Sequence, residues 1–189
     1  KDILIVLDLD GTLVHSHPVQ DENYCETGIP CPLHSKKGKL CTHARPRLHY
    51  FVRKLHYYYS VAVWSTASCR YVNWIVDEIM PVEIYWHKVF CKNHLDHIKP
   101  HENQPEISIK DLEKLEWEMQ NIICIDDRTH TYKFCEQNLL WIRRWKGQDE
   151  EIGTGLLLLL RILRFLLEEW PENVTEGIRK IAVEFPLKL

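Results

Sequence analysis

The sequence predicts an α/β fold in which helices cover both faces of a parallel sheet, and three apolar runs carry this prediction. Residues 3–7, 60–64 and 121–125 are short, apolar and rich in β-branched side chains, which is typical of strands buried on both faces. Helix-like segments at residues 48–58 and 109–119 precede the second and the third run. Strands that alternate with helices in this way favour a parallel sheet.

The rest of the chain continues the alternation and ends in helices. Pro81 and Pro171 each mark the end of a helix-like segment, because proline cannot continue a helix. The further elements expected are a helix at residues 68–80, short strands at 89–91 and 139–142, and helices at 154–170 and 174–183.

The composition limits the class of protein and its surroundings. With 189 residues and 45% hydrophobic side chains, the chain is expected to form a single domain over residues 1–189. The net charge of −3 does not indicate a nucleic-acid binder, although a local basic patch leaves nucleic acid open as a partner. Arg161 and Arg164 interrupt the most apolar stretch, which is too short to span a bilayer, so no membrane association is expected. The 7 scattered cysteines favour reduced thiols in an intracellular protein, either nuclear or cytoplasmic.

Two irregular stretches, residues 17–43 and 94–106, are expected to be small insertions at the edge of the sheet. The first contains five thiol or imidazole side chains, namely Cys25, Cys31, His34, Cys41 and His43. Four of these could hold Zn²⁺ tetrahedrally, but their spacing is not that of an ordinary zinc finger. A solvent-facing insertion that happens to contain them is the simpler alternative, so zinc stays an open prediction.

Acidic side chains follow the first and the third predicted strand. Asp8 and Asp10 come after the first strand, and Asp126 and Asp127 come after the third. The carboxyl ends of parallel strands meet at one edge of the sheet, where ligands bind. Like charges at one edge are unfavourable unless a cation joins them, and oxygen ligands suit Mg²⁺. The sequence therefore predicts a magnesium site at this edge.

The spacing of Asp8 and Asp10 suits a phosphatase in which one carboxylate attacks phosphorus and the other transfers protons. Phosphoryl transfer depends on positioning and charge neutralisation, so a cation and a hydrogen-bond donor are also needed. Lys110, at the start of the helix expected before the third strand, and Thr66, after the second strand, are the candidates. An Asp-x-Asp pair alone is usually a turn or a helix cap. Together with Thr66, Lys110 and the Asp126–Asp127 pair, however, it favours the phosphatase.

Four motifs occur in the order that is found in the haloacid dehalogenase (HAD) superfamily and resemble those of its FCP/SCP branch. That branch comprises the small-CTD-phosphatase and NLI-interacting-factor-like proteins. The motifs are Asp-Leu-Asp-Gly-Thr-Leu-Val at residues 8–14, Trp-Ser-Thr-Ala-Ser at 64–68, Ile-Lys-Asp-Leu at 109–112 and Ile-Asp-Asp at 125–127. Together with Arg-Pro at residues 45–46 and the Leu-rich last helix, the resemblance covers roughly residues 2–180.

This resemblance implies a Rossmannoid HAD core with a small insertion in place of a large cap, and a Mg²⁺-dependent reaction through an aspartyl-phosphate. It implies that Asp8 is the nucleophile and Asp10 the acid/base, while Thr66 and Lys110 bind the phosphoryl group. The implied metal ligands are Asp8, Asp127 and the backbone carbonyl of Asp10. Asp126 and Thr12 are implied to support the site.

The implied substrate is a phosphoserine or phosphothreonine in a protein or peptide. Gly11, where the branch often has Glu, and Arg47, where it has Gly, put this substrate in doubt. A phosphatase for a small metabolite or for a nucleic-acid phosphate end is the alternative. A non-catalytic binding module is a third reading, since the branch includes a mitochondrial import component. The segments between the motifs are too short for a full cap, which leaves the site open and favours a macromolecular substrate.

Overall fold

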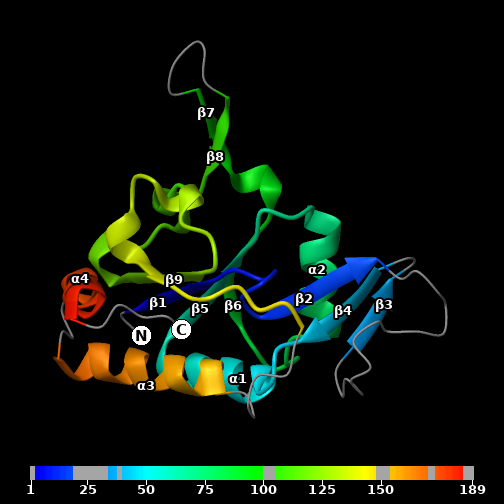
Figure 1. The fold of residues 1–189 in the computed structure, drawn as a ribbon, viewed down its shortest axis with the longest axis horizontal. Coiled ribbons are helices and arrows are strands. Elements are labelled where there is room, and N and C mark those ends of the chain that lie inside the picture. Colours follow the sequence, from blue (N-terminus) through cyan, green and yellow to red (C-terminus); the bar gives the residue numbers. More distant parts are fainter. Residues whose placement is uncertain are drawn as a thin grey trace.

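A central sheet of five parallel strands organises the protein (Figure 1). The computed structural model describes residues 3–18, 34–37, 40–99, 105–147, 154–169 and 173–184. The strands lie in the order β10 (Leu139–Trp141), β9 (Ile122–Asp126), β1 (Leu4–Leu7), β5 (Ser60–Trp64) and β6 (Trp86–Phe90). The predicted α/β class and parallel sheet are confirmed.

The strand order creates a switch point beside β1. The chain runs from β1 to β5 and β6 on one side and then crosses to β9 and β10 on the other. All four residues of β1 are fully buried, as its continuous apolar run predicts. In open parallel sheets, ligands bind at such a switch point, beyond the carboxyl ends of the strands. The edge where β1 and β9 end is therefore the expected place for chemistry.

One face of the sheet packs against α-helices. The helices are α1 (Leu48–Tyr58), α2 (Cys69–Glu78), α3 (Thr154–Glu169) and α4 (Val174–Glu184). Their buried side chains form one core with the odd-numbered residues of β1, β5 and β9. Figure 1 shows α1 and α3 side by side on this face. None of the helices in the described ranges is long and apolar enough to cross a bilayer.

The other face is covered by short 3₁₀ helices, and the continuous helix predicted at residues 109–119 is wrong. A 3₁₀ helix at Leu112–Leu115 stands there instead. Its apolar residues, three positions apart, are both buried, so the observed spacing fits a 3₁₀ turn as well as an α-helix. Glu116, with a left-handed φ of 55°, stops the turn after four residues. Further 3₁₀ helices at His130–Tyr132 and Glu136–Asn138 complete this layer.

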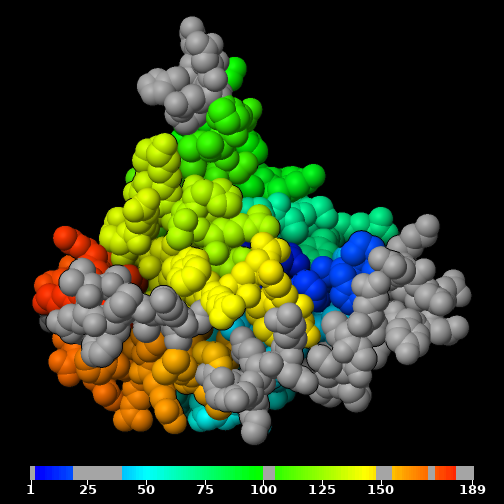
Figure 2. All heavy atoms as spheres, in the orientation of Figure 1, coloured from blue at the N-terminus to red at the C-terminus, as the bar shows by residue number. Residues whose placement is uncertain are grey.

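Both stretches expected to be irregular contain strands. The first holds a three-stranded antiparallel sheet of β2 (Val14–Pro18), β4 (Leu40–Ala44) and β3 (His34–Lys37). The second holds the hairpin of β7 (Asp96–Ile98) and β8 (Ile107–Ile109). Figures 1 and 2 show this hairpin protruding from the body of the molecule, opposite α1 and α3.

The expectation that the cysteines are all reduced is wrong for one pair. Cys69, at the start of α2, and Cys91, directly after β6, form a disulfide. Cys41, Cys124 and Cys135 are buried thiols. No local pattern indicated the pair, because the two residues lie 22 positions apart and only the crossover from β5 to β6 brings them together.

Candidate active site

Asp8 lies one residue beyond β1, and both of its carboxylate oxygens have partners. Lys110 Nζ lies 3.4 Å from Oδ1, and the hydroxyl of Thr12 donates to Oδ2 at 3.3 Å. The backbone N–H of Asp8 donates to the carbonyl of Ile125 in β9 at 3.0 Å. These contacts fix the carboxylate at the predicted edge of the sheet, and only 5% of the residue is exposed.

Lys110 is the buried cation of the site. It follows β8 instead of starting a helix, and its backbone N–H donates to the carbonyl of Thr131 at 2.8 Å. Its ammonium group donates to Asp126 Oδ2 at 2.6 Å and to the hydroxyl of Tyr132 at 3.2 Å, and its side chain is fully buried. Burial lowers the pKa of Lys110, but the charges of Asp8 and Asp126 outweigh it and raise the pKa above the ordinary value. The side chain is therefore charged at neutral pH.

The turn after β1 depends on Gly11 and is held by Arg45. Gly11 has φ of +87°, a conformation that side chains with a Cβ rarely adopt, and a Cβ there would lie 2.8 Å from Asp127 Oδ2. The Arg45 guanidinium donates to the carbonyl of Thr12 at 2.9 Å. A larger residue at position 11, as the resemblance suggests for other members, therefore requires a different turn beside Asp127.

Asp10 is held by a chain of hydroxyl groups that the sequence did not reveal. The Tyr71 hydroxyl donates to Asp10 Oδ1 at 2.5 Å and also contacts the Ser16 hydroxyl. Ser16 in turn lies 2.6 Å from the Thr42 hydroxyl. Burial raises the pKa of Asp10, and the hydrogen bond from Tyr71 partly opposes this. Tyr71 lies inside the correctly predicted α2, where helix periodicity does not distinguish it from its neighbours.

Thr66 lies on the loop that follows β5, at the same edge of the sheet. Leu7 pairs with Val63 in the β1–β5 register, so Thr66 comes just beyond the strand end that neighbours Asp8. Contacts on both sides hold the loop: Ser65 N–H donates to Phe90 O at 3.0 Å, and Lys92 N–H donates to Ala67 O at 2.9 Å.

Asp8, Asp126 and Asp127 form a carboxylate cluster whose oxygens lie within 4.8 Å of one another. Asp126 is already satisfied, by Lys110 at Oδ2 and by the N–H of Arg128 at Oδ1. Asp127 differs: Arg144 lies 3.4 Å from Oδ2, but Oδ1 is buried and has no hydrogen-bond partner among the described residues. A buried carboxylate oxygen without a partner is unfavourable, so this donor set fits a divalent cation with oxygen ligands.

The pKa shifts of the carboxylates also favour a cation at the cluster. Burial raises the pKa of Asp8 to about 8; Lys110 opposes the rise, while Asp126, Asp127 and Asp10 add to it. Burial and the neighbouring Asp126 also raise the pKa of Asp127 above its ordinary range. A second cation beside Lys110 would relieve this repulsion.

The structure thus brings together Asp8, Lys110, Asp126 and Asp127, with Thr12 beneath Asp8. Thr66 lies at the same edge, and the side chain of Asp10 turns toward Tyr71 instead of the cluster. Of the five candidate zinc ligands, Cys25 and Cys31 lie outside the described residues, and Cys41 and His43 are buried in β4. The fifth, His34, begins β3, where it pairs with His43 in the strand register.

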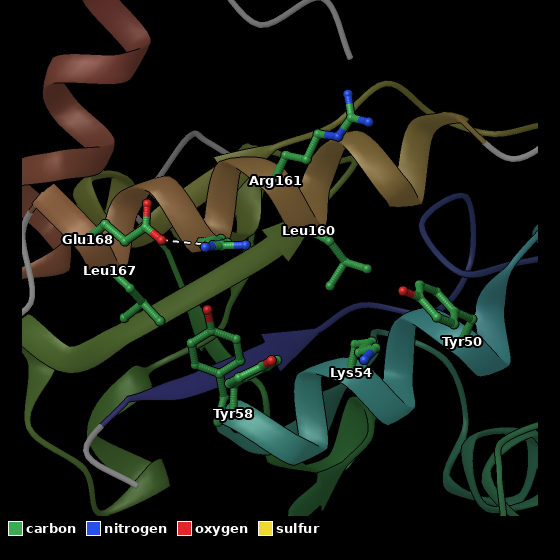
Figure 3. Close-up of a pocket in the computed structure, with 9 residues that line it drawn as sticks. Tyr50, Lys54, Tyr58, Leu160, Arg161, Leu167 and Glu168 are labelled. Carbon is green, nitrogen blue, oxygen red and sulfur yellow. Dashed lines mark hydrogen bonds and ion pairs between the residues drawn. The ribbon is translucent and has the colours of Figure 1, made fainter.

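A separate groove of about 580 Å³ lies between α1 and α3, away from this chemistry (Figure 3). Tyr50, Lys54 and Tyr58 line it from α1, and α3 contributes Leu160 and the ion pair of Arg164 with Glu168. None of its lining residues belongs to the carboxylate cluster.

Comparisons with solved structures support the fold. A fission yeast RNA polymerase II CTD phosphatase, Fcp1, was solved as a variant bound to beryllium fluoride. It matches 97% of this chain and 63% of its own, with a TM-score of 0.58 and 14% sequence identity. At this identity the likeness concerns the fold alone.

Relatives of known name fall into two groups. A probable C-terminal domain small phosphatase of Dictyostelium discoideum is 25% identical over 169 residues, which cover 87% of this chain and 50% of the relative. The mitochondrial import inner membrane translocase subunit TIM50 of Kluyveromyces lactis is 24% identical over 186 residues, covering 98% of this chain and 33% of the relative. The chain thus spans half or less of these two relatives.

The family model for NLI interacting factor-like phosphatases matches residues 3–175, nearly the whole described chain. The resemblance inferred from the four motifs is thereby confirmed. The chain belongs to the NLI interacting factor-like phosphatase family.

Proposed function

We propose that residues 1–189 form one Mg²⁺-dependent phosphatase domain that passes through a phosphoryl-enzyme on Asp8. The observation that carries the proposal is the Asp8 carboxylate, held at the switch point 3.4 Å from the buried ammonium of Lys110 and beside Asp126 and Asp127. A nucleophile, a fixed cation and a cluster suited to a metal are the groups that phosphoryl transfer requires.

In the first step, an Asp8 oxygen attacks phosphorus and the bond to the leaving oxygen breaks. Asp10 gives that oxygen a proton, from Oδ2, because Tyr71 holds Oδ1. In the second step, Asp10 takes a proton from water, whose oxygen attacks the phosphorus and releases inorganic phosphate and free Asp8. Lys110 and Thr66 neutralise and orient the phosphoryl oxygens.

Asp8, Asp127 and the backbone carbonyl of Asp10 are the groups proposed to hold Mg²⁺, which when bound supplies positive charge to the phosphoryl oxygens. Asp126 supports them by fixing Lys110, because both of its oxygens are already engaged.

The proposed substrate is a phosphoserine or phosphothreonine in a protein. Among the described residues, two small insertions are added to the core sheet: the β2–β4–β3 sheet and the β7–β8 hairpin. Insertions of this size leave room for a polypeptide at the site. The relative named as a probable C-terminal domain small phosphatase supports the same class of substrate. The similarity to an import subunit supports the competing proposal of a binding module without catalysis.

A turnover panel distinguishes these proposals. The purified protein is given phosphoserine and phosphothreonine peptides, nucleotides, 5′-phosphorylated oligonucleotides and a generic aryl phosphate, each with and without Mg²⁺. We expect Mg²⁺-dependent release of phosphate that is fastest with the peptides. Strict preference for nucleotides or oligonucleotides would overturn the protein substrate, and no release from any compound would favour the binding module.

Tyr71 is expected to position Asp10, and removing its hydroxyl tests this. Tyr71→Phe should lower kcat by about 10-fold, the effect of one hydrogen bond to a charged group, and leave KM unchanged. The hydrogen bond lowers the pKa of Asp10, so its loss should raise that pKa. Asp10 then protonates at higher pH, and the limb of the pH–kcat profile that reports Asp10 should move to higher pH.

The matched control for this variant is Tyr57→Phe, which removes a hydroxyl from a tyrosine that is 74% exposed on α1. Its profile should equal that of the unmodified protein. If Tyr71→Phe lowers kcat but leaves the apparent pKa of the limb that reports Asp10 unchanged, the positioning role is contradicted.

A further inference from the structure

Three potential metal ligands converge on the small antiparallel sheet, outside the carboxylate cluster. In the ladder between β2 and β4, His17 pairs directly with Cys41, and His43 lies two residues further along β4. Directly paired residues, and residues two apart on one strand, share a face of the sheet. The three side chains therefore meet on one face, and Ser16 and Thr42 meet on the other.

Two of the three distances between the ligand atoms lie close to the edges of a zinc coordination tetrahedron. His17 Nε2 lies 3.0 Å from His43 Nε2, and Cys41 Sγ lies 3.6 Å from the same His43 atom. With Zn–N of about 2.05 Å and Zn–S of about 2.3 Å at tetrahedral angles, the N···N edge is about 3.3 Å and the N···S edge about 3.6 Å. All three ligand atoms lie within 4.8 Å of one another, so one ion can reach them without rearrangement of the backbone.

The chemistry of these atoms selects the ion. Two imidazoles and a thiolate suit Zn²⁺ and not Mg²⁺, which prefers oxygen ligands. Cys41 and His43 are buried, with 0% and 3% exposure, so the ion would be shielded from bulk water.

We propose that His17, Cys41 and His43 bind Zn²⁺ and that the ion clamps β2 to β4. The site differs from the set expected from sequence, because it includes His17, which was not among the five candidate ligands. The register explains why spacing alone missed it: strand pairing brings His17 to Cys41, although the two residues lie 24 positions apart in the sequence. In Figure 1 these strands lie beside α2, whose Tyr71 contacts Ser16 on the opposite face of the ladder.

Metal analysis of the purified protein tests the site. The protein is equilibrated with Zn²⁺ in excess Mg²⁺, which occupies the oxygen ligands, and is then passed over a desalting column before elemental analysis. We expect about one Zn²⁺ per chain, and its removal by a chelator should lower the melting temperature in the presence of Mg²⁺. Replacement of the zinc by Co²⁺ should give a thiolate-to-cobalt charge-transfer band.

Variants separate this site from adventitious binding. His17→Gln and Cys41→Ser should each lose the zinc, and Cys41→Ser should also lose the cobalt band. The controls His97→Gln, on the β7–β8 hairpin, and Asp127→Asn, in the carboxylate cluster, should keep both. A protein that holds no zinc, that holds copper instead, or that keeps its zinc in both His17→Gln and Cys41→Ser would overturn the proposal without bearing on the phosphatase.

Discussion

Asp8→Asn is expected to reduce phosphatase activity by roughly 10⁴-fold or more, since losses of this size follow removal of a covalent nucleophile. The amide keeps the shape of the carboxylate and can still accept from Lys110, so the site should stay assembled. Turnover of the preferred phosphopeptide in Mg²⁺ measures the effect. Hydrolysis at the rate of the unmodified protein would end the proposal of a phosphoryl-enzyme on this residue.

The same variant should not lose stability. Burial and three neighbouring carboxylates raise the pKa of Asp8 to about 8. An acid whose pKa is raised on folding destabilises the folded state at any pH above its unfolded value. Between the two pKa values the folded chain must take up a proton that the unfolded chain does not hold, and above the folded value the acid must ionise in an unfavourable place. Replacing it with a neutral amide removes that cost, so the melting temperature at neutral pH without Mg²⁺ should equal or exceed that of the unmodified protein. An inactive variant that melts much earlier would instead mean that the site had collapsed.

Lys110→Met is expected to destabilise the protein by about 3–5 kcal/mol, the range found when one partner of a buried ion pair is removed. The side chain is fully buried, and it pairs with Asp126 at 2.6 Å and with Asp8 at 3.4 Å. Without it, the carboxylates face one another with no fixed cation between them. Urea unfolding at neutral pH measures the loss, and phosphatase activity should fall to background.

Lys88→Met is the matched control, because Lys88 pairs with Glu116 at 3.1 Å at the surface, where Glu116 is 76% exposed. Such surface pairs contribute roughly 0–1 kcal/mol, so this variant should unfold close to the unmodified protein. Mg²⁺ should restore part of the stability of Lys110→Met, because a divalent ion at the cluster offsets the same repulsion. Equal stability of the two variants would contradict the central role of the buried ammonium.

The sheet and its acidic edge could be predicted because each rests on a local pattern. A continuous apolar run such as the one before Asp8 is typical of a strand buried on both faces. The carboxyl ends of parallel strands lie at one edge of the sheet, independently of the conformation of the loops. Helix α1 was predicted with its observed bounds, since its buried residues Leu48, Phe51, Val52 and Leu55 follow the helical period.

What escaped prediction depends on contacts between distant segments. Tyr71 reaches Asp10 across 61 positions, and the disulfide of Cys69 with Cys91 depends on a crossover. The helix predicted around Lys110 failed because apolar residues three apart fit both a 3₁₀ turn and an α-helix, and a left-handed Glu116 decides between them. For Tyr71 and the disulfide the deciding quantity is a contact in space, for which a single sequence carries no local signal.

The central place of β1 in the sheet shapes how the chain reaches its native state. Both neighbours of β1, β5 and β9, come later in the sequence. At synthesis rates of about 5–20 residues per second, the Leu4–Leu7 strand leaves the ribosome roughly 10 s before β9 can pair with it. During that interval an apolar strand with an open edge is prone to self-association. Nascent chains interrupted before residue 122 should therefore depend on chaperones far more than the finished protein does.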